Sequence, residues 1–298
     1  MKNYIQFNLT VLILILTAFL NVNLLAKSKI APSVCDPKKG CCNGNSPKEE
    51  RTEPAEKEND NGKSGCQEKD TDAKDAQNLE EILEKLNKKT TGLKSLVAEI
   101  TYLYIQEPEL LDSRTLRKGK IFYKKHDKES MIRINFETIQ QDDWPSEDQK
   151  EQYIFNDYKI TKIDYKLKQI DVHHLKRSEK PFDAFEFISQ NFPMVGFTST
   201  EKLKKEFDIQ KIDSNEQKQI KLRLNVKKGS VYAQEYRIID FWVDKELFLP
   251  TRFVSTTNQG DIYDIKFDNV KTNKNLQNSV FRLEKPSGFS ENIRKSKD

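Results

Sequence analysis

Much of the chain after residue 92 alternates between apolar and polar positions. The clearest run is residues 220–226, where Ile, Leu, Leu and Val occupy every second position and Lys, Arg and Asn lie between them. Such alternation buries one face of a strand and leaves the other in water, as in antiparallel sheets. We therefore predict about ten or eleven strands in series. They include residues 96–104, 121–123, 132–136, 153–155, 159–165, 169–174, 220–226 and three strands within 241–267.

A helical period of 3.6 interrupts the strands at a few places. One helix is predicted to begin at the cap Asn78 and to end near Gly92, and others are predicted over 181–192 and after Thr198. Residues 140–151, around Trp144-Pro145, are predicted to form a long polar loop. Serial hairpins of this length curl, because a flat open sheet leaves edges and twists. The predicted fold class is mainly β with α, a strongly curved antiparallel sheet in the form of an open or half barrel.

The first 26 residues have the pattern of a signal peptide. Lys2 precedes the apolar run Leu9–Leu20, and Ala26 supplies a small residue at a cleavage point. The run is shorter than the roughly 20 apolar residues that a membrane span needs. We therefore expect an exported, periplasmic protein. The alternative is a protein anchored in the inner membrane through an uncleaved N-terminal segment.

Residues 27–77 are rich in charged and small polar residues, which predicts a disordered linker. This linker holds all four cysteines, Cys35, Cys41, Cys42 and Cys66. Structural zinc sites pair their cysteines two to four residues apart on both sides, whereas Cys66 stands alone. One or two disulfides are therefore favoured over a metal site in an exported protein. The three ways of pairing four cysteines remain open.

Charge and motifs exclude several classes of function. The chain of 298 residues has 51 basic and 47 acidic residues, a net charge of +4, and the two signs are interleaved. It lacks the basic stripe of a nucleic-acid-binding protein, and no nucleic-acid partner is expected. His173 and His174 are adjacent on a predicted strand and point to opposite faces, so they do not share a metal. No local catalytic motif is present, so we predict that the protein is not an enzyme. We also expect a monomer without a cofactor.

The order of the predicted elements, together with the C-terminal residues, resembles the outer-membrane lipoprotein carrier family (LolA-like). The resemblance rests on an ordered set of residues: Phe241-Trp242-Val243-Asp244, Leu249-Pro250, Gly260-Asp261, Phe267-Asp268-Asn269-Val270, Asn275, Ser279-Val280-Phe281 and Lys285-Pro286-Ser287-Gly288-Phe289. The predicted first helix and the strand that begins at Gly119 also fit. The resemblance covers residues 78–290, which we take as the folded domain, and leaves 291–298 as a tail.

The resemblance implies an open curved sheet whose apolar concave face is covered by helices. It also implies a periplasmic carrier that binds acyl chains of lipoproteins or other lipids and moves them between membranes. An inner-membrane donor and an outer-membrane acceptor protein are then the expected partners. The alternative is an envelope sensor on the same fold that binds a lipid or lipoprotein and signals through protein contacts.

Strand parity selects the residues that are expected to meet the lipid. They are Tyr102, Tyr104, Ile121, Tyr123, Ile134, Phe136, Phe241, Val243, Ile265 and Phe267. A closed hydrophobic core is the other interpretation of each, and parity does not say which face is concave. The family usually has Arg-Pro where this chain has Lys125-His126, and the Arg helps to close the lid. Lysine lacks the planar fork of arginine, so Lys125 is a gating candidate or an ordinary exposed lysine.

Overall fold

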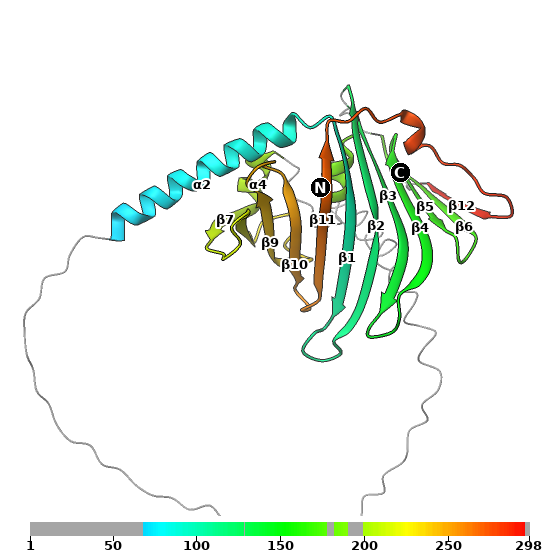
Figure 1. Cartoon of the computed structure of the whole chain (residues 1–298), viewed down its shortest axis with the longest axis horizontal. Coiled ribbons are helices and arrows are strands. Elements are labelled where there is room, and N and C mark those ends of the chain that lie inside the picture. Colours follow the sequence, from blue (N-terminus) through cyan, green and yellow to red (C-terminus); the bar gives the residue numbers. More distant parts are fainter. Residues whose placement is uncertain (1–67, 128, 178–181, 190–198, 296–298) are drawn as a thin grey trace, which may run out of the picture. The chain divides into compact units, whose positions relative to one another are not determined.

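The computed structural model describes residues 68–127, 129–177, 182–189 and 199–295 (Figure 1). The predicted signal segment and all four cysteines lie outside these residues. Within the described part of the chain, none of the helices combines the length and the apolar character that a membrane span requires.

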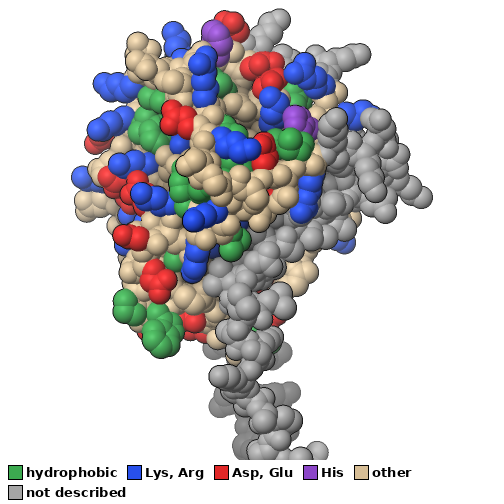
Figure 2. All heavy atoms as spheres, turned by 90° about the vertical axis from the view of Figure 1, so that its right-hand side faces the viewer, with side chains coloured by type: hydrophobic (Ala, Val, Ile, Leu, Met, Phe, Trp, Pro, Cys, Tyr) green, Lys and Arg blue, Asp and Glu red, His purple; other side chains and the backbone are tan. Residues whose placement is uncertain are grey.

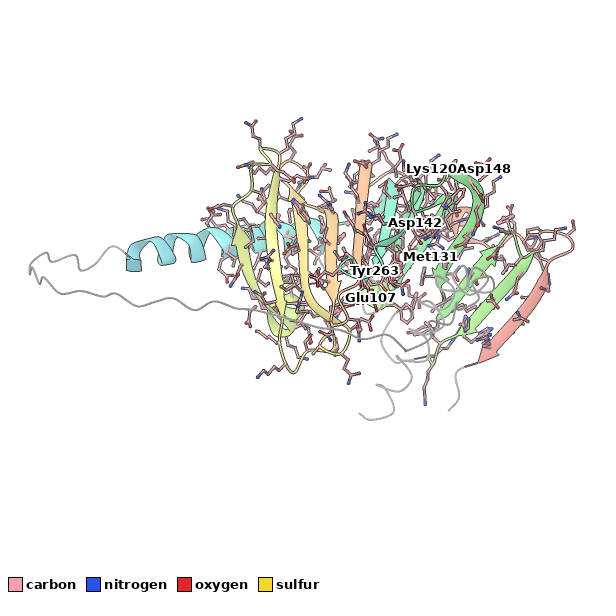
Figure 3. All side chains as sticks on the ribbon, turned by 90° about the horizontal axis from the view of Figure 1, so that it is seen from below. Glu107, Lys120, Met131, Asp142, Asp148 and Tyr263 are labelled. Atoms are coloured by element: carbon pink, nitrogen blue, oxygen red, sulfur yellow. The ribbon has the colours of Figure 1, made fainter. Side chains whose placement is uncertain are left out.

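The described residues form a single 12-stranded sheet in the order β12-β6-β5-β4-β3-β2-β1-β11-β10-β9-β8-β7. Neighbouring strands are antiparallel, except that β12 runs parallel to β6. The strands at the two ends of this order do not pair with each other, so the sheet is unclosed, and it arches when viewed from below (Figure 3). The strands are β1 Ser95–Gln106, β2 Ser113–His126, β3 Glu129–Gln141, β4 Glu147–Asn156, β5 Lys159–Asp164, β6 Gln169–His174, β7 Phe207–Ile212, β8 Gln219–Val226, β9 Tyr236–Asp244, β10 Pro250–Thr257, β11 Ile262–Thr272 and β12 Ser290–Lys295.

The helices are α2 Glu68–Thr91, α3 Ala184–Ser189, α4 Thr200–Glu206 and the short 3-10 helix η2 Asn278–Phe281. Helix α2 begins well before the predicted cap Asn78, which lies inside it. Residues 68–77 lack the apolar positions of a packed helix, but six of the ten are Ala, Lys, Glu or Gln, which favour helix. Extending an existing helix is much easier than nucleating a new one, so α2 continues through them.

Two polar segments belong to the sheet rather than to loops. Strand β3 continues to Gln141 and β4 begins at Glu147, so the predicted loop over 140–151 shrinks to the turn 142–146. Its polar residues pair across strands, as Thr138 does with Asp148. Residues 290–295, which overlap the predicted tail, form β12 and cover the edge of β6.

One face of the sheet is largely apolar across β1 to β4 and across β8 to β11. Ala98, Ile121, Ile134 and Tyr153 are successive register partners across β1 to β4. On the other side of β1, Tyr102 leads through Ile265, Phe253 and Phe241 to Leu222 on β8. Tyr263 belongs to this face and Lys120 to the opposite one. Figure 3 places Tyr263 inside the arch, so the apolar face is the concave face.

The convex face is polar and carries the C-terminal segment. Lys124 Nζ donates to the carbonyl of Leu276 at 2.6 Å, and Arg133 donates to the carbonyl of Val280 at 2.8 Å. A small apolar cluster lies on β5 and β6 of this face, and the ring of Phe289 packs edge-on against Tyr165 beside it, with centroids 5.4 Å apart. The observed architecture is the open, strongly curved sheet that the sequence predicts.

Gly119 is required where β2 departs from regular pairing. The register with β3 shifts between Lys118 and Gly119, and a Cβ at Gly119 would lie 1.8 Å from the carbonyl oxygen of Asn135. We expect Gly119→Ala to destabilise the fold by at least about 2 kcal/mol, because the backbone must move. Gly229→Ala is the control, since no atom lies within 4 Å of its Cβ position. Urea unfolding of both variants checks this, and equal midpoints would contradict it.

Candidate functional site

All ten residues predicted to meet the lipid lie on the concave face, and none exposes more than 8% of its surface. Strand parity therefore grouped them correctly, although they come from β1, β2, β3, β9 and β11. Their burial shows that the face is covered within the protein itself. Their role in lipid binding stays a prediction.

Aromatic rings line much of the concave face. Phe267 contacts Phe253 edge-on with centroids 6.0 Å apart, and Phe253 stacks on Phe241 at 6.3 Å. Further along, Phe136 lies 6.1 Å from Tyr102 and 6.2 Å from Tyr153. Such rings contribute large apolar areas to this face.

A group of tyrosines lies towards the end of the face where β1 meets β2. Tyr263 stacks on Tyr104 at 5.0 Å and contacts Tyr102 at 6.3 Å and Tyr236 at 6.4 Å. The hydroxyl of Tyr104 donates to Asp261 at 3.1 Å. Burial, with the neighbouring tyrosines, raises the pKa of Tyr263 far above its ordinary value. These phenols are therefore neutral at physiological pH and add no charge to the face.

Residues 182–189, which we call the lid segment, cover the face near β3 and β4. The ring of Phe185 lies 4.2 Å from that of Tyr123, and Phe187 lies 6.3 Å from Phe155. Helix α3 has six residues, too few to be stable alone in water. The lid segment therefore owes its structure to its contacts with the sheet.

Ser130 on β3 fixes the start of the lid segment through three hydrogen bonds. Its amide donates to the carbonyl of Phe182 at 2.9 Å, and its hydroxyl accepts from the amide of Ala184 at 2.7 Å. The same hydroxyl donates to Asp183 Oδ1 at 3.2 Å. Ser130 is itself buried. The Ser130 hydroxyl thus adds two hydrogen bonds to the ring contacts between the lid segment and the sheet, and no feature of the sequence pattern indicates it.

The gating candidate Lys125 lies directly opposite Ser130 in the register of β2 and β3. Its side chain is exposed, and its amide donates to the carbonyl of Lys94 at 2.8 Å. Within the described part of the chain its ammonium group makes no ion pair and no hydrogen bond. The described contacts that hold the lid segment come from Ser130 and from the ring contacts of Phe185 and Phe187, and a gating role of Lys125 stays a prediction.

The concave face also contains a buried ion pair that the sequence pattern does not reveal. Arg117 Nε lies 3.9 Å from Glu151 Oε2, and both side chains are almost fully buried. Glu151 accepts further hydrogen bonds from Tyr153 and Gln149, each at 3.0 Å. In the strand register Arg117 faces Tyr102, and Glu151 faces Phe136. The pair therefore lies within the aromatic lining described above.

A second, less buried pair extends this polar group towards β5. Asp164 is the register partner of Glu151, and Lys162 Nζ lies 3.8 Å from Asp164. The same ammonium lies 5.9 Å from the centroid of the Tyr153 ring. The concave face is thus apolar across most strands, and the charged side chains that it carries on β2, β4 and β5 are balanced in sign. No group of His, Cys, Asp or Glu side chains suited to a metal ion is present among the described residues.

Comparison with known proteins gives similarities at the level of structure. No family model and no curated protein matches the sequence. A conserved protein from Thermus thermophilus is 14% identical, with a TM-score of 0.42, over 73% of this chain and 99% of that one. A LolA superfamily protein from Nitrosomonas europaea is 11% identical, with a TM-score of 0.33, over 68% and 97%.

A complex of MucA and MucB from Pseudomonas aeruginosa also matches, at 11% identity and a TM-score of 0.39, over 70% of this chain and 61% of that one. At these identities and scores the similarities carry no inference about function. The geometry itself, a curved and unclosed sheet with a helix on its apolar concave face, is the open half-barrel architecture that the sequence predicts.

Proposed function

We propose that this chain binds acyl chains of lipoproteins or other lipids on the concave face of its sheet and carries them between membranes. The observation that carries the proposal is a broad aromatic face covered on one side by a short lid segment. The face lies on a rigid sheet, whereas the lid is held by a few ring contacts and by Ser130.

Binding in this scheme is an exchange of apolar contacts. Displacing the lid segment would expose Tyr123 and Phe155 to water, and this costs a free energy of about 25 cal/mol per Å² of apolar surface exposed. An acyl chain returns about 0.8 kcal/mol per buried CH₂, so about a dozen buried methylenes contribute on the order of 10 kcal/mol. A chain of ordinary length is therefore sufficient to hold the lid open. No nucleophile is needed, which supports a binding protein over an enzyme.

The remaining parts of the proposal concern export and organisation. We propose that residues 1–26 direct export, that 27–77 join the domain to this segment, and that donor and acceptor proteins lie in the two membranes. A sensor on the same fold shares the lipid-binding step. It differs in delivering a signal through a protein contact instead of delivering the lipid.

Ser130→Ala tests the lid. Without the hydroxyl, the amide of Ala184 and the carboxylate of Asp183 each lose a hydrogen-bond partner. This destabilises the closed lid segment by about 1–2 kcal/mol, which raises the equilibrium constant for lid opening roughly tenfold. We expect a fatty acid with an environment-sensitive fluorophore to bind several-fold faster to this variant, as measured by stopped-flow fluorescence.

The matched control is Ser255→Ala, a buried serine on the concave face of β10 whose hydroxyl has no hydrogen-bond partner among the described residues, and which β2, β1 and β11 separate from Ser130 on β3. It should leave the binding rate unchanged. Equal binding rates in the wild type and both variants would show that opening of the lid segment does not limit fatty-acid binding. Failure of the wild type to bind the fatty acid at all would contradict the proposed function itself.

A further inference from the structure

Two neighbouring turns at one end of the sheet present large apolar side chains to solvent. Leu110 and Leu111 in the β1–β2 turn are 81% and 60% exposed, and Trp144 in the β3–β4 turn is 70% exposed. These turns lie at the lower edge of the sheet in Figure 1, where Figure 2 shows hydrophobic side chains projecting beside acidic ones. Exposed apolar groups clustered in this way mark interaction surfaces.

The two turns are fixed against each other by hydrogen bonds. Asp142 Oδ1 accepts from the amide of Arg114 at 2.6 Å, and the amide of Asp142 donates to the carbonyl of Arg114 at 2.7 Å. Within the first turn the carbonyl of Glu107 accepts from the amides of Leu110 and Leu111, both at 2.8 Å. Figure 3 labels Glu107 and Asp142, one from each turn. The apolar side chains are therefore held on an ordered backbone, which lowers the entropic cost of binding.

The charge around these side chains has one dominant sign. Residues 107–114 contain three acidic side chains and 141–148 contain four, so the two segments hold seven acids and one basic residue, Arg114. Arg114 is already bonded to Asp112 at 2.9 Å, and Glu109, Asp143, Glu147 and Asp148 are exposed. We call residues 107–114 and 141–148 the acidic–apolar rim.

We propose that the acidic–apolar rim docks a cationic amphipathic segment of a partner protein, in which lysines or arginines alternate with aliphatic residues. Trp144, Leu110 and Leu111 would supply the apolar contacts, and the acids would steer the approach and select the sign of the partner. An anionic membrane surface fits poorly, because the same acids are repelled by it. The inference goes beyond the proposed lipid carriage and does not depend on it.

The β5–β6 turn, at the same end of the sheet, provides a natural control. Leu167 is 65% exposed, similar to the leucines of the rim, but it lies between Lys166 and Lys168. If exposed leucine alone were sufficient, this turn would bind the same partners as the rim. If the acids matter, it would not.

Two synthetic peptides with the same leucines test the proposal, one with lysines and one with glutamates at the intervening positions. Trp144 is the reporter, because the second tryptophan, Trp242, is buried. We expect the lysine peptide to shift the tryptophan emission to the blue, with an affinity that falls as salt rises. The glutamate peptide and vesicles of phosphatidylcholine or phosphatidylglycerol should produce no shift.

The variants separate the two parts of the rim. Leu110→Ser with Leu111→Ser should weaken lysine-peptide binding at least tenfold, and Asp143→Asn with Glu147→Gln should weaken it several-fold and flatten its salt dependence. Leu167→Ser should leave it unchanged. Equal loss with Leu167→Ser, equal binding of the glutamate peptide, or vesicle binding that depends on Leu110 and Leu111 would each overturn the proposal, the last in favour of a membrane.

Discussion

Replacing Glu151 with alanine is expected to destabilise the fold by about 3–5 kcal/mol. The change leaves the buried guanidinium of Arg117 without its carboxylate, and it removes the acceptor for the hydroxyl of Tyr153. An uncompensated buried charge is among the largest single destabilising effects in a protein. Chemical denaturation monitored by circular dichroism measures the loss. A change below about 1 kcal/mol would show that water or other groups already solvate the pair.

The double variant Arg117→Met with Glu151→Met is the control for this prediction. It removes both charges and keeps much of the apolar volume, so it should be far less destabilised than either single variant. A double-mutant cycle then gives the coupling between the two side chains. Additive losses would mean that the two groups do not act as a pair, despite their separation of 3.9 Å.

Phe185→Ala is expected to open the lid segment without unfolding the sheet. Losing the ring that packs 4.2 Å from Tyr123 costs about 3–5 kcal/mol in a packed site, which is more than a hundredfold in an opening equilibrium. The amide of Phe187, bonded to the carbonyl of Asp183 at 2.9 Å, should exchange its hydrogen correspondingly faster. Amides in the middle of β1 should keep their protection, because the lid opens as a local unit.

Phe289→Ala is the matched change on the convex face, where the ring contacts Tyr165. It should leave the exchange of the Phe187 amide unaltered. If Phe185→Ala instead accelerates exchange in β1 as much as in α3, the lid segment belongs to the global folding unit. The covering of the concave face would then be a permanent core and not a lid.

The face of the sheet was predictable because it depends on local alternation. Ile121 and Tyr123 alternate with lysines, and the same rule applies independently to Ile134 on β3 and Ile265 on β11. Each strand buries its own apolar side, so the alternation within each strand is enough to assign its apolar residues to the one buried face of the sheet. The resemblance to the lipoprotein carrier family added that this face is concave and covered by helices, which the arch and the lid segment now show.

The polar groups of the site were not predictable because they depend on contacts far apart in the chain. Arg117 and Glu151 look like ordinary charged strand positions, and their meeting follows from the register of three strands. The same is true of Ser130, which acts on Ala184. The predicted start of α2 at Asn78 was wrong for another reason. Residues 68–77 carry no apolar stripe, and a helix that extends through them by intrinsic propensity leaves no periodic pattern in the sequence.

Native mass spectrometry of the protein purified from its own envelope tests the central claim most directly. Lipid carriage predicts that the protein holds an acyl-bearing lipid or lipoprotein, and that mild delipidation yields an empty form that takes up one fatty-acyl probe. It also predicts that Ser130→Ala retains at least as much of the native ligand as Ser255→Ala, because its lid segment competes less strongly for the concave face. A protein that emerges empty and takes up no fatty-acyl probe would contradict lipid carriage by this chain.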